Sequence, residues 1–171
     1  MFGISDVIKF LISFFIIFPI VTFIHLSGHI FFVTLFGGTE RKIVIGCGKK
    51  MFLFLNVEVR KYYFWNGACE FKSLKYDNRI TNTLIYLGGA FFNVTSIFII
   101  NGLIFSGIIN ESVIVFQFIY FSFYVLFFSL FPMDFANGSP SDGKAAMLAL
   151  KDKHDDKFTD DIMIKKENDK K

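Results

Sequence analysis

Two histidines, His25 and His29, lie four residues apart in the apolar run FIHLSGHIFF, residues 23–32. Residues at this spacing project from the same face of an α-helix, one turn apart. Two imidazoles placed in this way can both reach one zinc ion at about 2.0–2.1 Å. The position after the first histidine holds Leu26, whose side chain can neither accept nor release a proton. The pair therefore predicts a helical metal site that lacks a general base at this position.

A histidine on an apolar face has an alternative interpretation, as a core residue with its hydrogen bonds satisfied. Inside a membrane-spanning helix the balance changes, because an ionisable side chain is costly there and generally has a function. A catalytic zinc ion also needs a third protein ligand and one open position for water. The candidate is Asp142, in a loop indicated by Pro140 and Gly143, although an Asp-Gly pair in a loop is also a common turn. Asp134 and His154 are weaker candidates.

Membrane-spanning helices are the elements that have to position these residues. The chain of 171 residues is 53% hydrophobic and contains 26 phenylalanines, far from the composition of a soluble domain. Three runs without charge, residues 10–36, 83–109 and 112–133, each exceed the roughly 20 residues that cross a bilayer as a helix. We therefore expect a polytopic membrane protein with the lipid bilayer as its surroundings.

The distribution of charge predicts the orientation of the chain. Residues 37–80 carry nine lysines and arginines against four acids, so the positive-inside rule places this segment and the C-terminal tail in the cytoplasm and the N-terminus outside, most simply in the cell membrane. The net charge of +3 reflects this topology, and we expect no nucleic-acid partner. Cys47 and Cys69 fall in the cytoplasmic segment and are expected to be free thiols.

Residues 41–75 have a different character, rich in β-branched and aromatic side chains. Gly46, Gly48 and the pair Asn66-Gly67 interrupt this segment, which predicts two to four short strands joined by tight turns. Open strand edges cannot face lipid, so the sheet should lie at the cytoplasmic surface or against the helices.

The predicted fold is thus mainly α, with three transmembrane helices and a small cytoplasmic-side β-sheet insertion. The membrane domain is expected over residues 1–150, with a short helix at 144–150. Residues 151–171 are expected to form a charged, disordered or frayed cytoplasmic tail.

Four elements occur along the chain in a recognisable order: IHLSGH (24–29), IGCGKKMFLF followed by WNGACEFK (45–72), LGGAFFNV (87–94) and SLFP…SPSDG (129–143). Together they resemble the site-2 protease family of intramembrane zinc metallopeptidases. The first resembles that family's HExGH helix, and the second resembles its glycine-containing β-segment. The resemblance extends over roughly residues 15–150.

The last two elements resemble the family's Gly-Pro-x-x-Asn and Asn-x-x-Pro…Asp-Gly motifs. In this chain Ala90 replaces the proline and Ser129 replaces the first asparagine. The resemblance implies that His25, His29 and Asp142 are the zinc ligands. It also implies that Asn93 lies near the substrate-binding side of the site, whereas its residue type alone equally suits a hydrogen bond between helices.

In the family that the chain resembles, the glutamate after the first histidine transfers the protons needed for peptide hydrolysis. Leu26 cannot do this, and the hydroxyl of Ser27 is a poor base at neutral pH. Another acid would have to take over this role, and the sequence places none within reach of the histidines. The four acids considered are Glu40, Glu58, Glu70 and Asp134.

Three functions are compatible with this sequence. The first is a zinc metalloendopeptidase that acts on a transmembrane or membrane-bound peptide, by a slow route or with a relocated base. The second is a catalytically inactive relative that binds zinc and a membrane peptide without cutting it. The third is a small membrane transport or immunity component without a metal. The first two share a metal site formed by His25, His29 and Asp142 and differ in turnover.

Overall fold

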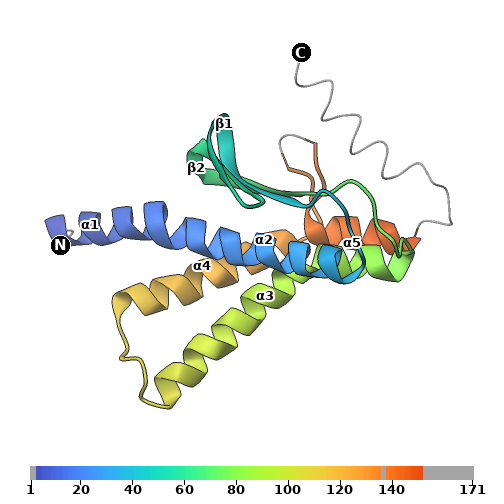
Figure 1. Cartoon of the computed structure of the whole chain (residues 1–171). Helices are drawn as coiled ribbons and strands as arrows, with labels where there is room; N and C mark the ends of the chain where they lie inside the picture. The colour runs from blue at the N-terminus through green and yellow to red at the C-terminus, as the bar shows by residue number, and fades with distance from the viewer. Residues whose placement is uncertain (1–2, 136–137, 152–171) are drawn as a thin grey trace.

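The computed structural model describes residues 3–135 and 138–151, without the side chains of residues 5, 65 and 66. The chain forms a bundle of long helices with one hairpin of strands laid along it (Figure 1). The elements are α1 (Ile4–Ile12), η1 (Ser13–Ile17), α2 (Phe18–Leu35), β1 (Lys42–Phe54), β2 (Val57–Glu70), α3 (Arg79–Phe105), α4 (Val113–Leu130) and α5 (Asp142–Lys151). Apart from Lys151, which ends α5, the predicted tail lies outside the described residues.

Three helices in the described part of the chain are long and apolar enough to cross a membrane: Asp6–Leu35, Arg79–Phe105 and Val113–Leu130. Large apolar side chains such as Phe98 and Phe123 are exposed on their outer surfaces, as expected for helices that face lipid. The prediction of three apolar spans in a mainly helical protein is therefore confirmed.

Helix α3 begins at Arg79, four residues before the uncharged run that starts at Thr83. The side chain of Asn78 sets this start, because its Oδ1 accepts hydrogen bonds from the N–H groups of Ile80 and Thr81, at 3.0 Å each. Hydropathy located the span, whereas capping chemistry determines where the helix begins.

The first span is one continuous rod made of α1, η1 and α2 (Figure 1). Its middle segment, Ser13–Ile17, is a π-helix that lies just before Pro19. Proline has no N–H to donate to the preceding turn, and a wider turn at this point accommodates the missing hydrogen bond. The Ser13 hydroxyl donates to the Lys9 carbonyl oxygen at 2.7 Å and also contacts the side chain of Gln117, which ties this span to α4.

Helices α2 and α3 meet backbone to backbone where Gly28 lies against Gly88. A Cβ atom at Gly28 would lie 2.2 Å from the carbonyl oxygen of Gly88, so neither helix can carry a side chain there. Small residues at such a crossing let helix backbones approach closely in a membrane. This contact brings α3 against the face of α2 that carries both histidines.

The β-rich segment forms one long antiparallel hairpin of β1 and β2, whose turn lies at Leu55 and Asn56. The tight turns predicted at Gly46, Gly48 and Asn66-Gly67 are wrong, because all four residues lie within strands. Gly46 and Gly48 have φ values of +87° and +85° and lie where the register shifts, so they form bulges that bend the hairpin.

The hairpin packs against the first span rather than standing apart from it. The ring of Phe64 lies 5.6 Å from the ring of Phe14 and 5.0 Å from that of Phe15, measured between centroids. Further along β2, a Cβ atom at Gly67 would meet Leu26 Cδ1 at 2.5 Å. Strand β2 therefore runs directly over the part of α2 that follows His25. Cys47 and Cys69, one on each strand, are not joined in a disulfide.

A buried carboxylate holds the bent hairpin together. Glu58 is only 4% exposed, and it forms ion pairs with Lys42 and with Arg60, the latter at 2.7 Å between Arg60 Nε and Glu58 Oε1. The hydrogen bonds from Lys42 and Arg60 lower the pKa of Glu58 from 4.5 to about 2. The carboxylate is therefore ionised over the whole physiological pH range.

Replacing Glu58 by glutamine should loosen the hairpin, because Lys42 and Arg60 then lose their charged partner. We expect the free energy of local opening of β1 and β2 at pH 7 to fall by about 1–3 kcal/mol, measured by hydrogen exchange and mass spectrometry in detergent. The folded-state pKa lies below the ordinary value, so the wild-type advantage should shrink as the pH falls from 4.5 toward 2.

The matched control is Glu40→Gln. Glu40 pairs with Lys72 at 2.8 Å, but both side chains are 67% exposed, and an exposed pair contributes little to stability. Equal losses of protection in the two variants would contradict a special role for Glu58.

Candidate metal centre

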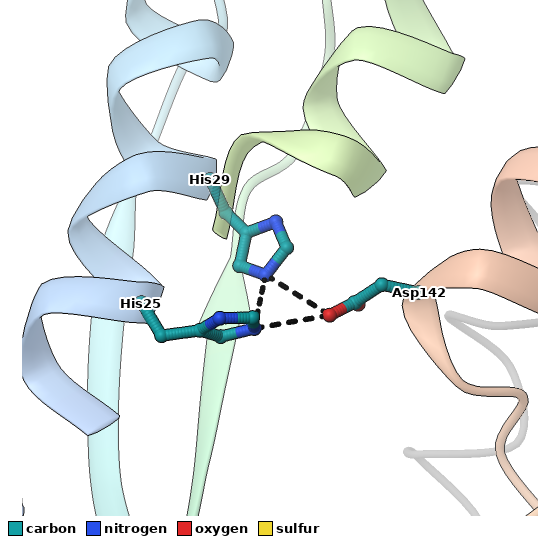
Figure 2. Close-up of side chains that lie close together, drawn as sticks. All are labelled: His25, His29 and Asp142. Carbon is teal, nitrogen blue, oxygen red and sulfur yellow. Dashed lines mark hydrogen bonds and ion pairs between the residues drawn. The ribbon is translucent and has the colours of Figure 1, made fainter. Parts of the chain in front are cut away.

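The three predicted metal ligands converge in the structure (Figure 2). His25 Nε2 lies 3.0 Å from Asp142 Oδ2, His29 Nε2 lies 3.5 Å from the same oxygen, and the two Nε2 atoms are 3.1 Å apart. Both histidines are buried on α2, and the carboxylate approaches from the start of α5. Residues 117 positions apart in the chain thus form one compact cluster.

The donor atoms of this cluster fit a divalent metal ion such as zinc. Four ligands at about 2.0 Å from a tetrahedral ion lie about 3.3 Å from one another, and the three observed separations lie on both sides of that value. His29 Nδ1 lies 2.7 Å from the carbonyl oxygen of Ile85. A carbonyl can only accept, so Nδ1 carries the proton and Nε2 presents a lone pair to the cluster.

Asp142 is the first residue of α5 and not part of a loop, which corrects its predicted placement. Ser141, which is fully buried, explains this start. Its hydroxyl donates to the carbonyl oxygen of Phe131 at 2.6 Å and accepts from the N–H of Lys144 at 3.3 Å, in the manner of a helix N-cap. Gly143 then allows α5 to approach α4, since a Cβ atom there would lie 2.0 Å from the Leu130 carbonyl oxygen.

The weaker candidates for the third ligand differ in their placement. Asp134 forms an ion pair with Lys144 at 2.5 Å and a β-bridge with Pro140, and it is not part of the cluster. His154 lies outside the described residues. Burial raises the pKa of the Asp142 carboxyl, but the neighbouring imidazoles of His25 and His29 lower it by more, so this pKa lies below its usual range.

A cavity of about 340 Å³ adjoins the cluster. It is lined mainly by apolar and aromatic side chains from the helices, together with the β2 segment Gly67, Ala68 and Cys69. Leu26 is buried in its wall, packed on Gly67. The cavity is thus an apolar chamber with three polar ligands at one side and a β-strand along another.

No described acid other than Asp142 lines this cavity. Two of the acids that could replace the missing glutamate form ion pairs away from the cavity. Glu58 pairs with Lys42 and Arg60 in the hairpin, and Glu40 pairs with Lys72. Glu70 and Asp134 also lie outside the cavity lining. The described part of the chain therefore offers no relocated general base beside the three ligands.

Two contributions of α3 to the site were not expected from the sequence. Ile85 contributes its carbonyl oxygen to His29, and a backbone group carries no signal in the residue type. Gly89 contributes the absence of a side chain, since a Cβ atom there would lie 2.4–2.6 Å from ring atoms of His25 and His29. The resemblance drew attention to Gly89, but only the structure gives the reason for glycine at this position.

One relative shows the family of this chain. The uncharacterized membrane protein YwmF of Bacillus subtilis (strain 168) is 42% identical over 151 residues, which cover 88% of the chain and 94% of YwmF. The chain belongs to the YwmF family of membrane proteins. No family model and no solved structure matches it. Membership of the YwmF family agrees with the three apolar helices, and an integral membrane protein is thereby established.

Gly89→Ala should disrupt the metal centre without changing any ligand. The new methyl group would overlap the imidazoles of His25 and His29, which cannot move away because both are buried. We expect zinc affinity, measured by competition with a chromophoric chelator in detergent, to fall about tenfold or more.

Gly102→Ala on the same helix is the control, since a Cβ atom there meets nothing within 4 Å, and it should bind zinc like the wild type. Unchanged affinity in the Gly89 variant would show that the donor atoms do not meet as described.

Proposed function

We propose that this protein holds a divalent metal ion, zinc in the first instance, between His25, His29 and Asp142, in a membrane centre of the site-2 protease type. The observation that carries the proposal is the convergence of three potential ligand atoms, two imidazole Nε2 atoms and one carboxylate oxygen, within 3.5 Å of one another. In a buried membrane site, a metal ion among these atoms would give all three of them a partner.

The adjoining cavity supports a peptide as the partner of this centre. It is apolar, which suits a segment taken from a membrane helix, and strand β2 lines one wall, where an extended backbone could lie. A zinc ion held by the three ligands would polarise a carbonyl group and lower the pKa of water to about 7. The residues of the chain would then have to deliver a proton to the leaving nitrogen.

Proton delivery is the step that this chain does not support. Leu26 places an isobutyl group where a carboxylate is needed, and its packing on Gly67 keeps that part of the wall apolar. General acid–base assistance is worth roughly 10²–10⁴-fold in rate. We therefore assign the natural protein to metal and peptide binding, with hydrolysis slower by about that factor than in a site with glutamate.

The same proposal includes a location. The start of α3, the end of α4 and helix α5 lie at one end of the bundle, and the hairpin extends from there along the first span (Figure 1). Residues 37–80, which include the hairpin, are rich in lysine and arginine. The positive-inside rule then assigns this end to the cytoplasm and the N-terminus to the outside of the cell membrane. The cavity would open toward the cytoplasmic half of the bilayer.

The first test is the metal content of the purified protein in detergent, measured by plasma mass spectrometry for zinc and iron. We expect about one metal ion per chain, lost in His29→Ala because one of three protein ligands is removed. His154→Ala makes the same chemical change in the tail and should keep the metal. Absence of metal from the wild-type protein after growth with added zinc would overturn the proposed function.

The second test restores the missing carboxylate. Leu26→Glu should raise the cleavage of a transmembrane model peptide roughly 10²–10⁴-fold above the wild type, measured by mass spectrometry with zinc-loaded protein. Leu26→Gln has nearly the same shape without an ionisable group and should show no gain.

Equal, low turnover of the zinc-loaded Leu26→Glu and Leu26→Gln proteins would mean that the rest of the site does not support hydrolysis. The function would then be limited to binding.

A further inference from the structure

Three residues of α3, spaced by four positions, face the two imidazoles. They are Ile85, Gly89 and Asn93, and residues at this spacing lie along one face of a helix. Ile85 supplies a carbonyl oxygen to His29, and Gly89 leaves room for both rings and forms a backbone hydrogen bond with His25. The third residue of this row, Asn93, has its side-chain amide beside His25.

Asn93 is completely buried, with 0% of its surface exposed. Its amide nitrogen Nδ2 lies 3.4 Å from His25 Nδ1, and its amide oxygen Oδ1 has no hydrogen-bond partner. A buried acceptor without a partner costs about 1–3 kcal/mol. Asn93 also does not line the cavity beside the metal ligands, so its environment does not favour contact with a bound peptide.

A rotation of the amide by 180° gives its oxygen a partner. It exchanges Oδ1 and Nδ2, two atoms of nearly the same size, and places Nδ2 where Oδ1 stood. Oδ1 then lies against His25 Nδ1 and accepts its N–H. His25 Nε2 is left with a lone pair directed at Asp142 and His29, as Ile85 arranges for His29.

We infer that Asn93 is a positioning residue of the metal centre, which acts through His25 by holding its ring and its Nδ1–H tautomer. Asn93 and the Ile85 carbonyl both belong to α3, and together they orient the Nε2 lone pairs of His25 and His29 toward the same point. The inference rests on the proposed metal site and replaces the substrate contact that the family resemblance implies for this residue. Hydrogen bonds of this kind to a ligating histidine typically change metal affinity 10–100-fold.

The test compares the affinity of the detergent-purified protein for Co²⁺ and Zn²⁺ between Asn93 variants. Asn93→Leu keeps the volume but removes the acceptor, and it should bind both ions 10–100-fold more weakly. Asn93→Asp keeps an acceptor for Nδ1–H and should restore affinity to within about threefold of the wild type. Asn101→Leu makes the same substitution two turns further along α3, where Asn101 bonds only its own helix, and should change nothing.

A second measurement follows the Nδ1–H proton of His25 directly, by NMR of the zinc-loaded protein labelled with ¹⁵N-histidine. We expect a slowly exchanging, downfield Nδ1–H signal in the wild type and in Asn93→Asp, and its loss in Asn93→Leu. A residue that serves only to pack α3 would leave this signal unchanged.

Two outcomes would overturn the inference while leaving the metal site intact. One is wild-type metal affinity in Asn93→Leu, and the other is equal weakening in Asn93→Leu and Asn93→Asp. If the wild-type protein binds neither ion, the proposed function itself fails, so the two failures can be told apart. Thermal unfolding of the metal-free proteins, expected to be similar for all variants, shows that the comparison is made between folded chains.

Discussion

Everything at the candidate centre depends on how closely α3 approaches α2. At Gly28 and Gly88 the two helices meet backbone to backbone, with no room for a side chain on either. The next residue of α3, Gly89, lies directly against the imidazole rings. A larger separation would move the Ile85 carbonyl away from His29 and the Asn93 amide away from His25. The position of Asp142 also depends on a glycine, because Gly143 lets α5 approach Leu130 closely.

This arrangement solves an electrostatic problem that the bilayer imposes. Two imidazoles and a carboxylate inside a membrane protein have little access to water, so each polar atom needs a partner in the protein or an ion. The outward-facing nitrogens are matched by α3, and the inward-facing atoms are matched only by one another. Apolar side chains, Leu26 among them, form the remaining walls. The polarity is concentrated at one point instead of being spread along the helices.

The parts of this fold that were predictable from the sequence are those that depend on side-chain type. Hydropathy located the spans, and the four-residue spacing placed His25 and His29 on one face. Asp142 was identified as a candidate, but its helix was not, because Ser141, which caps it, is held by the Phe131 carbonyl at the end of α4. Gly46 and Gly48 were expected in turns since bulges and turns make the same demand on φ. The Ile85 carbonyl left no trace in the sequence.

The distance along the chain between the ligands has a consequence for biosynthesis. The two histidines belong to the first membrane helix, whereas Asp142 follows the last one, 117 residues after His25. A ribosome must therefore complete all three spans before the third ligand exists. Until then a nascent chain offers only a pair of imidazoles, which hold a metal ion far less tightly than the finished set. Under the proposed function, metal capture therefore belongs to the final stage of maturation, after the third span has been made.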